Sequence, residues 1–322
     1  MKILVTGGAG YIGSITVKRL QEKGYEVIVF DNLVYGHKES VSCKLVVGDL
    51  LDKEFLYKSL QGEKFDGVIH FAAYALAGES MEKPFKYFQN NILGGLNLLE
   101  FMKDQKIENI IFSSTCAMYG TPALLPVGEK AEENPESVYG ESKLMFEKIL
   151  AWYDRIYGIK HVNLRYFNAA GASLDGKLGE MHTPETHILP VAIKAALGNL
   201  PFSLFGSDYP PSDGTCIRDY IHISDLADAH IAALAYMRDG GKTRVFNCGD
   251  GHGSSVREVI TAIEKSTGEP MEIQTGSRRP GDPPALIADS SRFMHETGWK
   301  PRYGLDEIVR DEIAWKKRNS NG

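Results

Sequence analysis

Residues 6–13 have the sequence Thr6-Gly7-Gly8-Ala9-Gly10-Tyr11-Ile12-Gly13 and join a short apolar run to a longer amphipathic segment. Gly7, Gly10 and Gly13 recur at three-residue intervals. Between a strand and a helix, such glycines allow a tight turn, close approach of the backbone to a pyrophosphate, and close packing of helix on strand. The phosphates then meet the positive end of the helix dipole. The stretch therefore predicts a dinucleotide-binding turn.

Short apolar runs alternate with longer amphipathic segments through the first half of the chain, at residues 3–5, 27–30, 45–47, 68–71, 110–112 and 162–164. This alternation predicts strand, helix, strand, and right-handed crossovers then give a doubly wound parallel sheet of the Rossmann type. Helices are expected over residues 12–23, 84–103 and 138–157, with Gly24 and Gly158 ending the first and the last.

The composition of the chain changes after Asn168, where glycine and proline become frequent. We predict that residues 1–168 form the dinucleotide-binding domain. Residues 169–322 are expected to form mainly a smaller, loop-rich α/β substrate domain, from which some segments can return to the first domain. Such a partner, placed at the carboxyl ends of the strands, would close the site over a substrate.

Composition excludes several classes of partner. The 322 residues carry a formal net charge of -6, which argues against a nucleic-acid partner because phosphate binding needs an excess of clustered Lys and Arg. No apolar stretch approaches the roughly 20 residues that a membrane span needs, and no signal sequence precedes the first strand. Four separated cysteines suggest neither a disulfide framework nor a zinc site. A cytoplasmic protein is expected.

Acidic residues follow the next two predicted strands. Asp31 stands 18 residues after Gly13, where a carboxylate can accept hydrogen bonds from both ribose hydroxyls and would repel a 2′-phosphate. NAD is therefore expected rather than NADP. Asp49 could receive the adenine amino group, although a strand-end turn residue is an equal interpretation. The small side chains of Ala72 and Ala73, after Phe71, would leave room for the dinucleotide.

A hydroxyl cluster and a Tyr/Lys pair form the candidate catalytic set. Thr115 follows Ser113 and Ser114 at the end of the fifth predicted strand, and Tyr139 and Lys143 share one face of the next helix. An ammonium and an oxidised nicotinamide can lower the pKa of a Tyr, so we predict that Tyr139 is a general base for a substrate hydroxyl. Thr115 would hold that hydroxyl. A Tyr/Lys pair alone is more often an amphipathic surface pair; the glycine turn makes it specific.

Together these residues resemble the extended short-chain dehydrogenase/reductase family, and within it the UDP-hexose 4-epimerases. The resemblance covers nearly the whole chain. It includes Gly78-Glu79-Ser80, Asn90-Asn91, Arg165-Tyr166-Phe167-Asn168, Phe205-Gly206-Ser207-Asp208-Tyr209, Arg218-Asp219-Tyr220-Ile221-His222 and Arg278-Arg279-Pro280-Gly281-Asp282.

With the residues already named, the resemblance implies two sets of contacts. The cofactor would lie on Gly7, Gly10, Tyr11, Ile12, Gly13, Asp31, Asn32, Asp49, Leu50, Phe71, Ala72, Ala73, Asn91, Ser113, Tyr139, Lys143 and Tyr166. The UDP-sugar would lie on Thr115, Tyr139, Asn168, His187, Ile188, Phe205, Arg218, Arg279, Asp282 and Leu286. Two guanidiniums suit a diphosphate, although surface arginines usually do nothing specific.

The implied reaction interconverts UDP-galactose and UDP-glucose. Hydride and proton leave C4 of the hexose, a 4-keto sugar and NADH form, the sugar turns about its diphosphate linkage, and hydride returns to the opposite face. NAD would stay bound, and the resemblance also implies a homodimer, the commonest oligomer.

The chain departs from the family pattern at four positions. Thr115 stands where many members have Ser, and His187 where an Asn is frequent. Ala75 replaces a Lys that some members use near the cofactor, which bears on how tightly NAD is held. Leu286 replaces a bulky Tyr that blocks N-acetylated sugars in some members, and so hints at wider specificity.

Other functions stay open at this point. A UDP-pentose 4-epimerase, a dehydratase or a decarboxylase would share the oxidation at C4, but dehydratases place an Asp-Glu pair where this chain has Cys116-Ala117. A catalytically silent NAD-binding regulator would have no reason to keep Thr115, Tyr139 and Lys143. No metal site is predicted, because the histidines examined for one, His70, His182, His222 and His230, show no ligand-spaced cluster and are interpreted as packing or loop residues.

Overall fold

The computed structural model describes residues 1–183, 185–210, 213–278 and 283–319. Its main sheet has seven parallel strands in the order β11-β6-β5-β4-β1-β2-β3. The six predicted runs form β1 to β6. The strands are β1 (Lys2–Thr6), β2 (Glu26–Asp31), β3 (Lys44–Val47), β4 (Gly67–His70), β5 (Asn109–Thr115), β6 (Lys160–Tyr166) and β11 (Arg244–Cys248).

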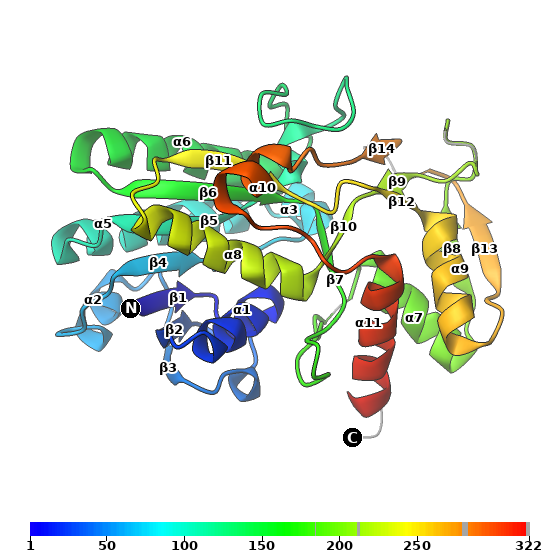
Figure 1. Ribbon diagram of the computed structural model, residues 1–322, viewed down its shortest axis with the longest axis horizontal. Coiled ribbons are helices and arrows are strands. Elements are labelled where there is room, and N and C mark those ends of the chain that lie inside the picture. The colour runs from blue at the N-terminus through cyan, green and yellow to red at the C-terminus, as the bar shows by residue number, and fades with distance from the viewer. Residues whose placement is uncertain (184, 211–212, 279–282, 320–322) are drawn as a thin grey trace.

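Helices cover both faces of this sheet (Figure 1). One face packs against α1 (Tyr11–Glu22), α8 (Ile223–Arg238) and α10 (Ser291–Thr297). The other packs against α2 (Lys53–Ser59), α5 (Gly95–Gln105) and α6 (Val138–Tyr157). Strand β1 shows why its sequence is almost entirely apolar: Ile3 and Val5 belong to one core and Leu4 to the other, and all three are fully buried.

The order in which strands are added to the parallel sheet reverses between β1 and β4. Because β2 lies on one side of β1 and β4 on the other, the loops after these strands diverge and leave a crevice at their carboxyl ends. The loop after β2 contains η1 (Lys38–Ser40), and the loop after β5 begins with η3 (Cys116–Tyr119). This crevice is where the fold places a ligand.

The helix predicted over residues 84–103 is not continuous. It consists of α4 (Pro84–Phe88), a π-helical turn η2 (Gln89–Gly94) and α5, preceded by α3 (Ala77–Glu82). The wider turn accompanies Asn91, whose side chain bonds to the backbone of Tyr74 and to Ser142 instead of facing solvent. By contrast, α6 has the predicted bounds; Ser137 caps its start, and Gly158 follows its end with φ 72°.

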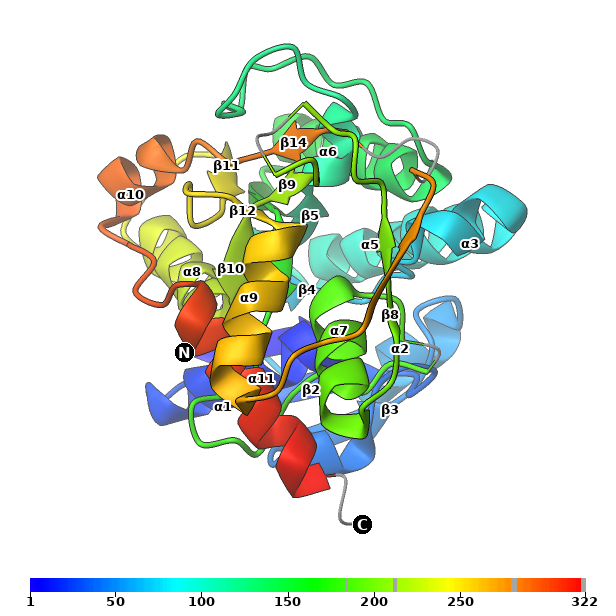
Figure 2. The same ribbon diagram turned by 90° about the vertical axis from the view of Figure 1, so that its right-hand side faces the viewer.

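The second half of the chain supplies a smaller group of elements beside the carboxyl edge of the main sheet (Figure 2). Three helices pack together there, α7 (Ile188–Gly198), α9 (Val256–Thr267) and α11 (Leu305–Asn319). Short strand pairs complete it: β7 (Asn168–Ala170) with β10 (Tyr220–His222), β8 (Phe202–Phe205) with β13 (Ile273–Gly276), and β9 (Ile217–Arg218) with β12 (Ser254–Ser255) and β14 (Ala285–Leu286).

These elements confirm the predicted fold class, a doubly wound parallel sheet with a smaller α/β part. Strand β11 and helices α8 and α10 come from beyond residue 169 and pack on the main sheet. Within the described residues, every helix is too short or too polar to cross a membrane.

Candidate active site

One large cavity of about 1150 Å³ opens at the carboxyl edge of the main sheet, where the smaller part of the molecule faces it. Its walls include the glycine turn, Asp31, Thr115, Tyr139 and Arg218. Pockets that hold one small ligand are commonly about 300–1,000 Å³. The size therefore suits a dinucleotide together with a second ligand.

The glycine turn has the geometry that the spacing predicted. Gly7 has φ 72°, and a Cβ on Gly13 would lie 2.2 Å from the carbonyl oxygen of Gly7. A Cβ on Gly10 would meet only that same oxygen, at 3.5 Å, so this position faces open space. Gly10 begins α1 without a side-chain cap. The backbone N–H groups of the first helical turn are thus left for an anion, and the cradle fits a pyrophosphate.

Acidic side chains stand where the adenosine half of a dinucleotide would lie. The carboxylate of Asp31 accepts from the backbone N–H groups of Ala9 (2.9 Å) and Leu33 (2.8 Å). Burial raises the pKa of Asp31, and these two bonds partly offset the rise. Asn32 Nδ2 donates to Asp49 Oδ2 at 3.0 Å. Asp31, Asn32 and Asp49 all line the cavity, as do the neighbouring predicted residues Leu50, Phe71, Ala72 and Ala73.

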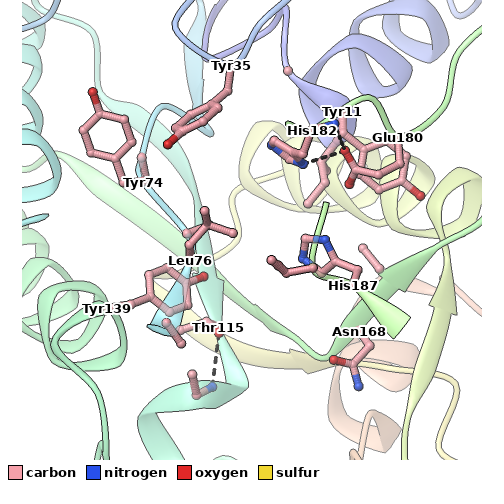
Figure 3. Close-up of a pocket in the computed structure, with 18 of the residues that line it drawn as sticks. Tyr11, Tyr35, Tyr74, Leu76, Thr115, Tyr139, Asn168, Glu180, His182 and His187 are labelled. Carbon is pink, nitrogen blue, oxygen red and sulfur yellow. Dashed lines mark hydrogen bonds and ion pairs between the residues drawn. The ribbon is translucent and has the colours of Figure 1, made fainter. Parts of the chain in front are cut away.

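Thr115, Tyr139 and Lys143 converge on the cavity from two elements (Figure 3 shows Thr115 and Tyr139). Thr115 ends β5 and is 6% exposed. Tyr139 lies in the first turn of α6, where its backbone N–H donates to Ser80 Oγ at 3.1 Å. The predicted i, i+4 pair is therefore placed beside the predicted hydroxyl.

The electrostatics of the pair differ from our prediction. Burial raises the pKa of Tyr139 to about 12, against a smaller lowering by the hydrogen bond from Thr115. Burial also lowers the pKa of Lys143 to about 7, and its Nζ donates to the carbonyl of Ser113 at 2.8 Å. The chain's own groups thus do not acidify Tyr139, because desolvation outweighs them.

Tyr166 and Ser113 complete this wall. Tyr166 Oη lies 2.6 Å from Ser113 Oγ, and burial raises the pKa of Tyr166. Both line the cavity, together with Tyr11 and Ile12 of the helix start. Asn91 is different: it is 4% exposed, does not line the cavity, and joins the loop after β4 to α6 through Ser142. The placement of Asn91 on the cofactor channel stays a prediction.

Apart from Thr115 and Tyr139, the residues predicted for the second ligand lie at or after residue 168. Those that line the cavity are Asn168, His187, Ile188, Phe205, Arg218 and Leu286. Arg218 donates to the carbonyl oxygens of Ile217 and Pro283. Leu286 pairs with Arg218 in the register of β14 and β9 and packs with Cys116 and Phe167. The predicted contacts Arg279 and Asp282 lie outside the described residues.

The sequence did not reveal an aromatic group on the cofactor side. Tyr35 and Tyr74 line the cavity with their ring centres 5.6 Å apart in an edge-to-face arrangement. Lys86 Nζ lies 4.2 Å from the centre of the Tyr74 ring and pairs with Glu79 at 2.9 Å. Tyr35 and Tyr74 line the same cavity as Ala75, the position at which some family members have a lysine. No spacing pointed to Tyr35, Tyr74 and Lys86, because they come from three separate segments.

Two histidines were predicted to be packing or loop residues and are buried in that way: His70 bonds to Thr6 Oγ1 at 2.7 Å, and His230 packs on Phe71. His182 requires a correction. Its ring belongs to a group that could hold a metal ion, with Glu180, Glu185 and His187, whose ligand atoms lie within 4.8 Å of one another. The described residues of this stretch, 180–183 and 185–187, belong to no helix or strand that would have shown this convergence in advance.

Comparisons with known proteins agree with this geometry. The model of the NAD dependent epimerase/dehydratase family matches residues 3–249. The UDP-glucose 4-epimerase of Lacticaseibacillus casei is 47% identical over 326 residues, covering 100% of this chain and 98% of that protein. The UDP-glucose 4-epimerase from Brucella ovis in complex with NAD superposes with a TM-score of 0.94 at 45% identity, covering 97% of both chains. The UDP-Glc/GlcNAc 4-epimerase from Campylobacter jejuni gives 0.86 at 40% identity, covering 98% of this chain and 99% of that one.

Proposed function

Because the chain belongs to the NAD dependent epimerase/dehydratase family, we propose that it interconverts UDP-galactose and UDP-glucose at C4 of the hexose. One observation carries the proposal. A single cavity is lined both by the glycine turn and by Thr115, Tyr139 and Lys143, so a hydride acceptor and a proton acceptor can meet one sugar carbon.

The chain's residues divide the work between binding and proton transfer. Bound NAD supplies the hydride acceptor, the later hydride donor and a positive ring. The start of α1 holds the pyrophosphate through backbone N–H groups, and Asp31 accepts from the ribose hydroxyls. Tyr139 Oη takes the proton of the C4 hydroxyl and later returns it, while Thr115 keeps that hydroxyl in line. Lys143 fixes the ribose side of the wall through its contact with Ser113.

A positive ring near Tyr139 is needed because the protein alone does not acidify this phenol. Burial raises the pKa of Tyr139 to about 12. Lowering the pKa of Tyr139 toward 7 requires roughly 1.4 kcal/mol of preferential stabilisation of the phenolate for each pKa unit. Nearby cations can supply this stabilisation. When bound, the positive ring of oxidised NAD would favour the ionised form of Tyr139, and that phenolate would accept the proton of the C4 hydroxyl.

The UDP part of the substrate would be held away from the reacting carbon. Arg218, with Arg279 as a second guanidinium, suits the diphosphate, and Phe205 and Asn168 face the same end of the cavity. Holding the diphosphate leaves the hexose free to turn and present its other face. A binding site fixed at UDP is what an epimerase requires.

The geometry disfavours dehydration. A dehydratase needs an added acid and base beside the hydroxyl cluster, and this chain has Cys116 and Ala117 there. Burial raises the pKa of Cys116 to about 12, so its thiol does not exchange protons near neutral pH. A UDP-pentose 4-epimerase, a decarboxylase and a silent NAD-binding regulator remain the alternatives for experiment.

The test is turnover of the NAD-loaded protein with UDP-galactose, followed by separation of UDP-glucose from UDP-galactose and of any UDP-4-keto product. We expect an equilibrium mixture of the two hexoses with NAD retained through purification. Zero turnover by protein that holds NAD would favour the regulator. Accumulation of a dehydrated or decarboxylated product, or turnover of UDP-pentoses alone, would replace the proposed reaction.

One observation favours a second activity on N-acetylated UDP-sugars. Leu286 lines the cavity and packs with Phe167, so no aromatic ring fills this position. A relative that superposes on this chain is a UDP-Glc/GlcNAc 4-epimerase. We propose that UDP-N-acetylglucosamine enters the same site and reacts at the same carbon.

We also propose that the working form is a cytoplasmic homodimer. Helix α6 exposes Met145, Trp152 and Ile156, with exposed fractions of 42%, 56% and 61%, and the adjacent α4 exposes Phe85. Apolar side chains grouped on neighbouring helices are typical of an interface. Light scattering of the native protein should give twice the chain mass, and Trp152→Glu should give one. A monomeric native protein would contradict the dimer.

A further inference from the structure

A group of four ionisable side chains lines the cavity, and Figure 3 shows three of them, Glu180, His182 and His187, across from Tyr139. It consists of Glu180, His182, Glu185 and His187, here called the Glu/His cluster, on the segment between β7 and α7. Each offers one ligand atom, and these atoms all lie within 4.8 Å of one another. The cluster has no part in the proposed proton transfer.

The contacts within the cluster fix two of its carboxylate oxygens. Glu180 Oε1 accepts from the backbone N–H groups of Met181 and His182, and lies 2.5 Å from His182 Nδ1. Glu185 Oε1 accepts from the backbone N–H of His187 at 2.7 Å and lies 2.8 Å from His187 Nδ1. The backbone thus holds the carboxylates in place, as a preformed ligand set requires.

A separate observation comes from α11. Glu312 is 1% exposed, lines the same cavity, and neither of its carboxylate oxygens has a hydrogen-bond partner. Burial raises the pKa of Glu312 to about 8; Lys316 lowers it, and the negative charges of Glu180 and Glu185 raise it further. Glu185 Oε2 is buried without a partner as well. Lys316 Nζ forms an ion pair with Glu312 Oε1 at 3.8 Å and donates to the carbonyl oxygen of Glu180 at 3.1 Å, so a single ammonium lies beside these carboxylates.

Buried carboxylate oxygens without donors are costly, because desolvation of a charged group is not repaid by any bond. Three carboxylates meet here beside a cavity proposed to receive two diphosphates. Two imidazoles and three carboxylates offer nitrogen and oxygen donors together, the combination that suits first-row divalent metals rather than Ca²⁺ or Mg²⁺. A divalent cation would satisfy the lone pairs and offset the charge.

We propose that Glu180, His182, Glu185 and His187 bind one divalent transition-metal ion of the Zn²⁺ type, with Glu312 as a nearby carboxylate that faces the same site. Zinc ligands at about 2.0–2.2 Å place neighbouring donor atoms about 3.4 Å apart in a tetrahedron. The ligand atoms farthest apart, at up to 4.8 Å, therefore need to approach by about 1.4 Å, and the short contacts of Glu180 with His182 and of Glu185 with His187 need to open, which rotations of Glu and His side chains provide.

The bound ion would join two segments that are far apart in sequence. The Glu/His cluster lies before α7, and Glu312 lies on α11, so the metal would link this wall of the cavity to the last helix. Metal binding to the folded chain then raises its stability by mass action. This effect is separate from epimerase turnover and can be measured without substrate.

The experiment uses the NAD-loaded protein after treatment with EDTA and exchange into chelator-free buffer. Zn²⁺ is added during calorimetric titration and in thermal melts, and Co²⁺ serves as an absorbance probe of tetrahedral ligation. We expect one high-affinity Zn²⁺ per chain and a melting temperature that rises with free Zn²⁺.

The variants His182→Gln and Glu185→Gln should each weaken Zn²⁺ binding by tenfold or more, and Glu312→Gln by a few-fold. The matched control is His252→Gln, because the exposed His252 pairs with Asp250 outside the cavity and should bind Zn²⁺ as the parent does. Melts recorded in EDTA show whether each variant folds. If the parent protein takes up no Zn²⁺, the proposal is wrong. It is also wrong if His182→Gln, Glu185→Gln and the parent bind Zn²⁺ equally, because the ion then binds elsewhere on the protein.

Discussion

The glycine turn, residues 6–13, and the Glu/His cluster each place several functional groups within eight residues, yet only the first showed its geometry in the sequence. The turn lies between β1 and α1, so its directions are set by a strand on one side and a helix on the other. The four residues of the cluster lie in no helix or strand. Spacing predicts geometry where secondary structure fixes the direction of each side chain, and not elsewhere.

The two regions also differ in how their charges are treated. The turn offers backbone N–H groups to an anion, and its neighbours Lys143 and His70 are buried, with pKa values lowered by that burial to about 7 and about 3. The cluster gathers carboxylates whose burial favours a cation. One wall of the cavity is thus built for phosphates and the other for positive charge.

The largest expected effect is the loss of proton transfer at the Tyr/Lys pair. Tyr139→Phe deletes the proton acceptor while keeping the ring, and should lower turnover of UDP-galactose on the order of a hundredfold or more, with little change in sugar binding. Steady-state kinetics of the NAD-loaded variant measure it. Tyr157→Phe, on the exposed end of the same helix, is the control and should behave as the parent. Near-normal turnover by Tyr139→Phe would remove Tyr139 from the mechanism.

The next effect tests the turn itself. In Gly13→Ala the new Cβ would lie 2.2 Å from Gly7 O, so the backbone must shift at the point where the pyrophosphate is expected. We expect a loss of about 1–3 kcal/mol in unfolding free energy and a clear drop in retained NAD. Urea unfolding and the NAD content of purified protein measure both. Gly128→Ala is the control, because a Cβ there meets nothing within 4 Å. Equal stability and equal NAD content in both variants would show that the turn tolerates the strain.

Much of the fold and part of the site followed from such local rules. Apolar runs gave the first six strands, and Ser137 and Gly158 bounded α6 where the pattern placed it. Tyr139 and Lys143 could be paired because one helix carries both. The order of β11 in the sheet could not be predicted, since its neighbour β6 ends 78 residues before it begins and only packing brings them together.

Long-range contacts account for what the sequence left out. Tyr35 and Tyr74 meet across the cavity from two loops, and Glu312 faces the Glu/His cluster from the last helix. Asn91 makes contacts that the motif match did not predict: its side chain accepts from the backbone N–H of Tyr74 and donates to Ser142 Oγ. The raised pKa of Tyr139 could not be predicted from the sequence for a similar reason, because the burial that raises it depends on every element around Tyr139.

A smaller effect is expected at the substrate side. Leu286→Tyr adds a ring to a 7% exposed position on the cavity wall, beside Cys116 and Phe167. Because the added volume can enter only the cavity, the ratio of UDP-N-acetylglucosamine to UDP-glucose turnover should fall about tenfold. The same change at the exposed Leu124 should leave the ratio alone. An unchanged ratio in Leu286→Tyr would mean that this wall does not select the substrate.

The smallest expected effect concerns acid stability and separates the two regions by sign. His70 is 2% exposed, and burial lowers its pKa to about 3, with a further lowering by Lys143. The unfolded chain therefore binds a proton near pH 6.5, whereas His70 in the folded chain binds one only near pH 3. Stability falls as pH falls between these values, by roughly 1.4 kcal/mol per pH unit at most for this one group. His230, with a pKa lowered by burial to about 4, acts in the same direction.

Urea unfolding at several pH values between 4.5 and 7 measures this slope, and His70→Gln should make it shallower because one of the buried histidines with a lowered pKa is gone. His182 behaves differently: burial lowers its pKa, but Glu180 raises it by more, so protonation there favours the folded chain. The acid slope should therefore belong to the buried histidines of the sheet. If the slope in His70→Gln is as steep as in the parent protein, His70 does not contribute to the loss of stability in acid. The burial of His70 at the end of β4 then does not keep its imidazole neutral.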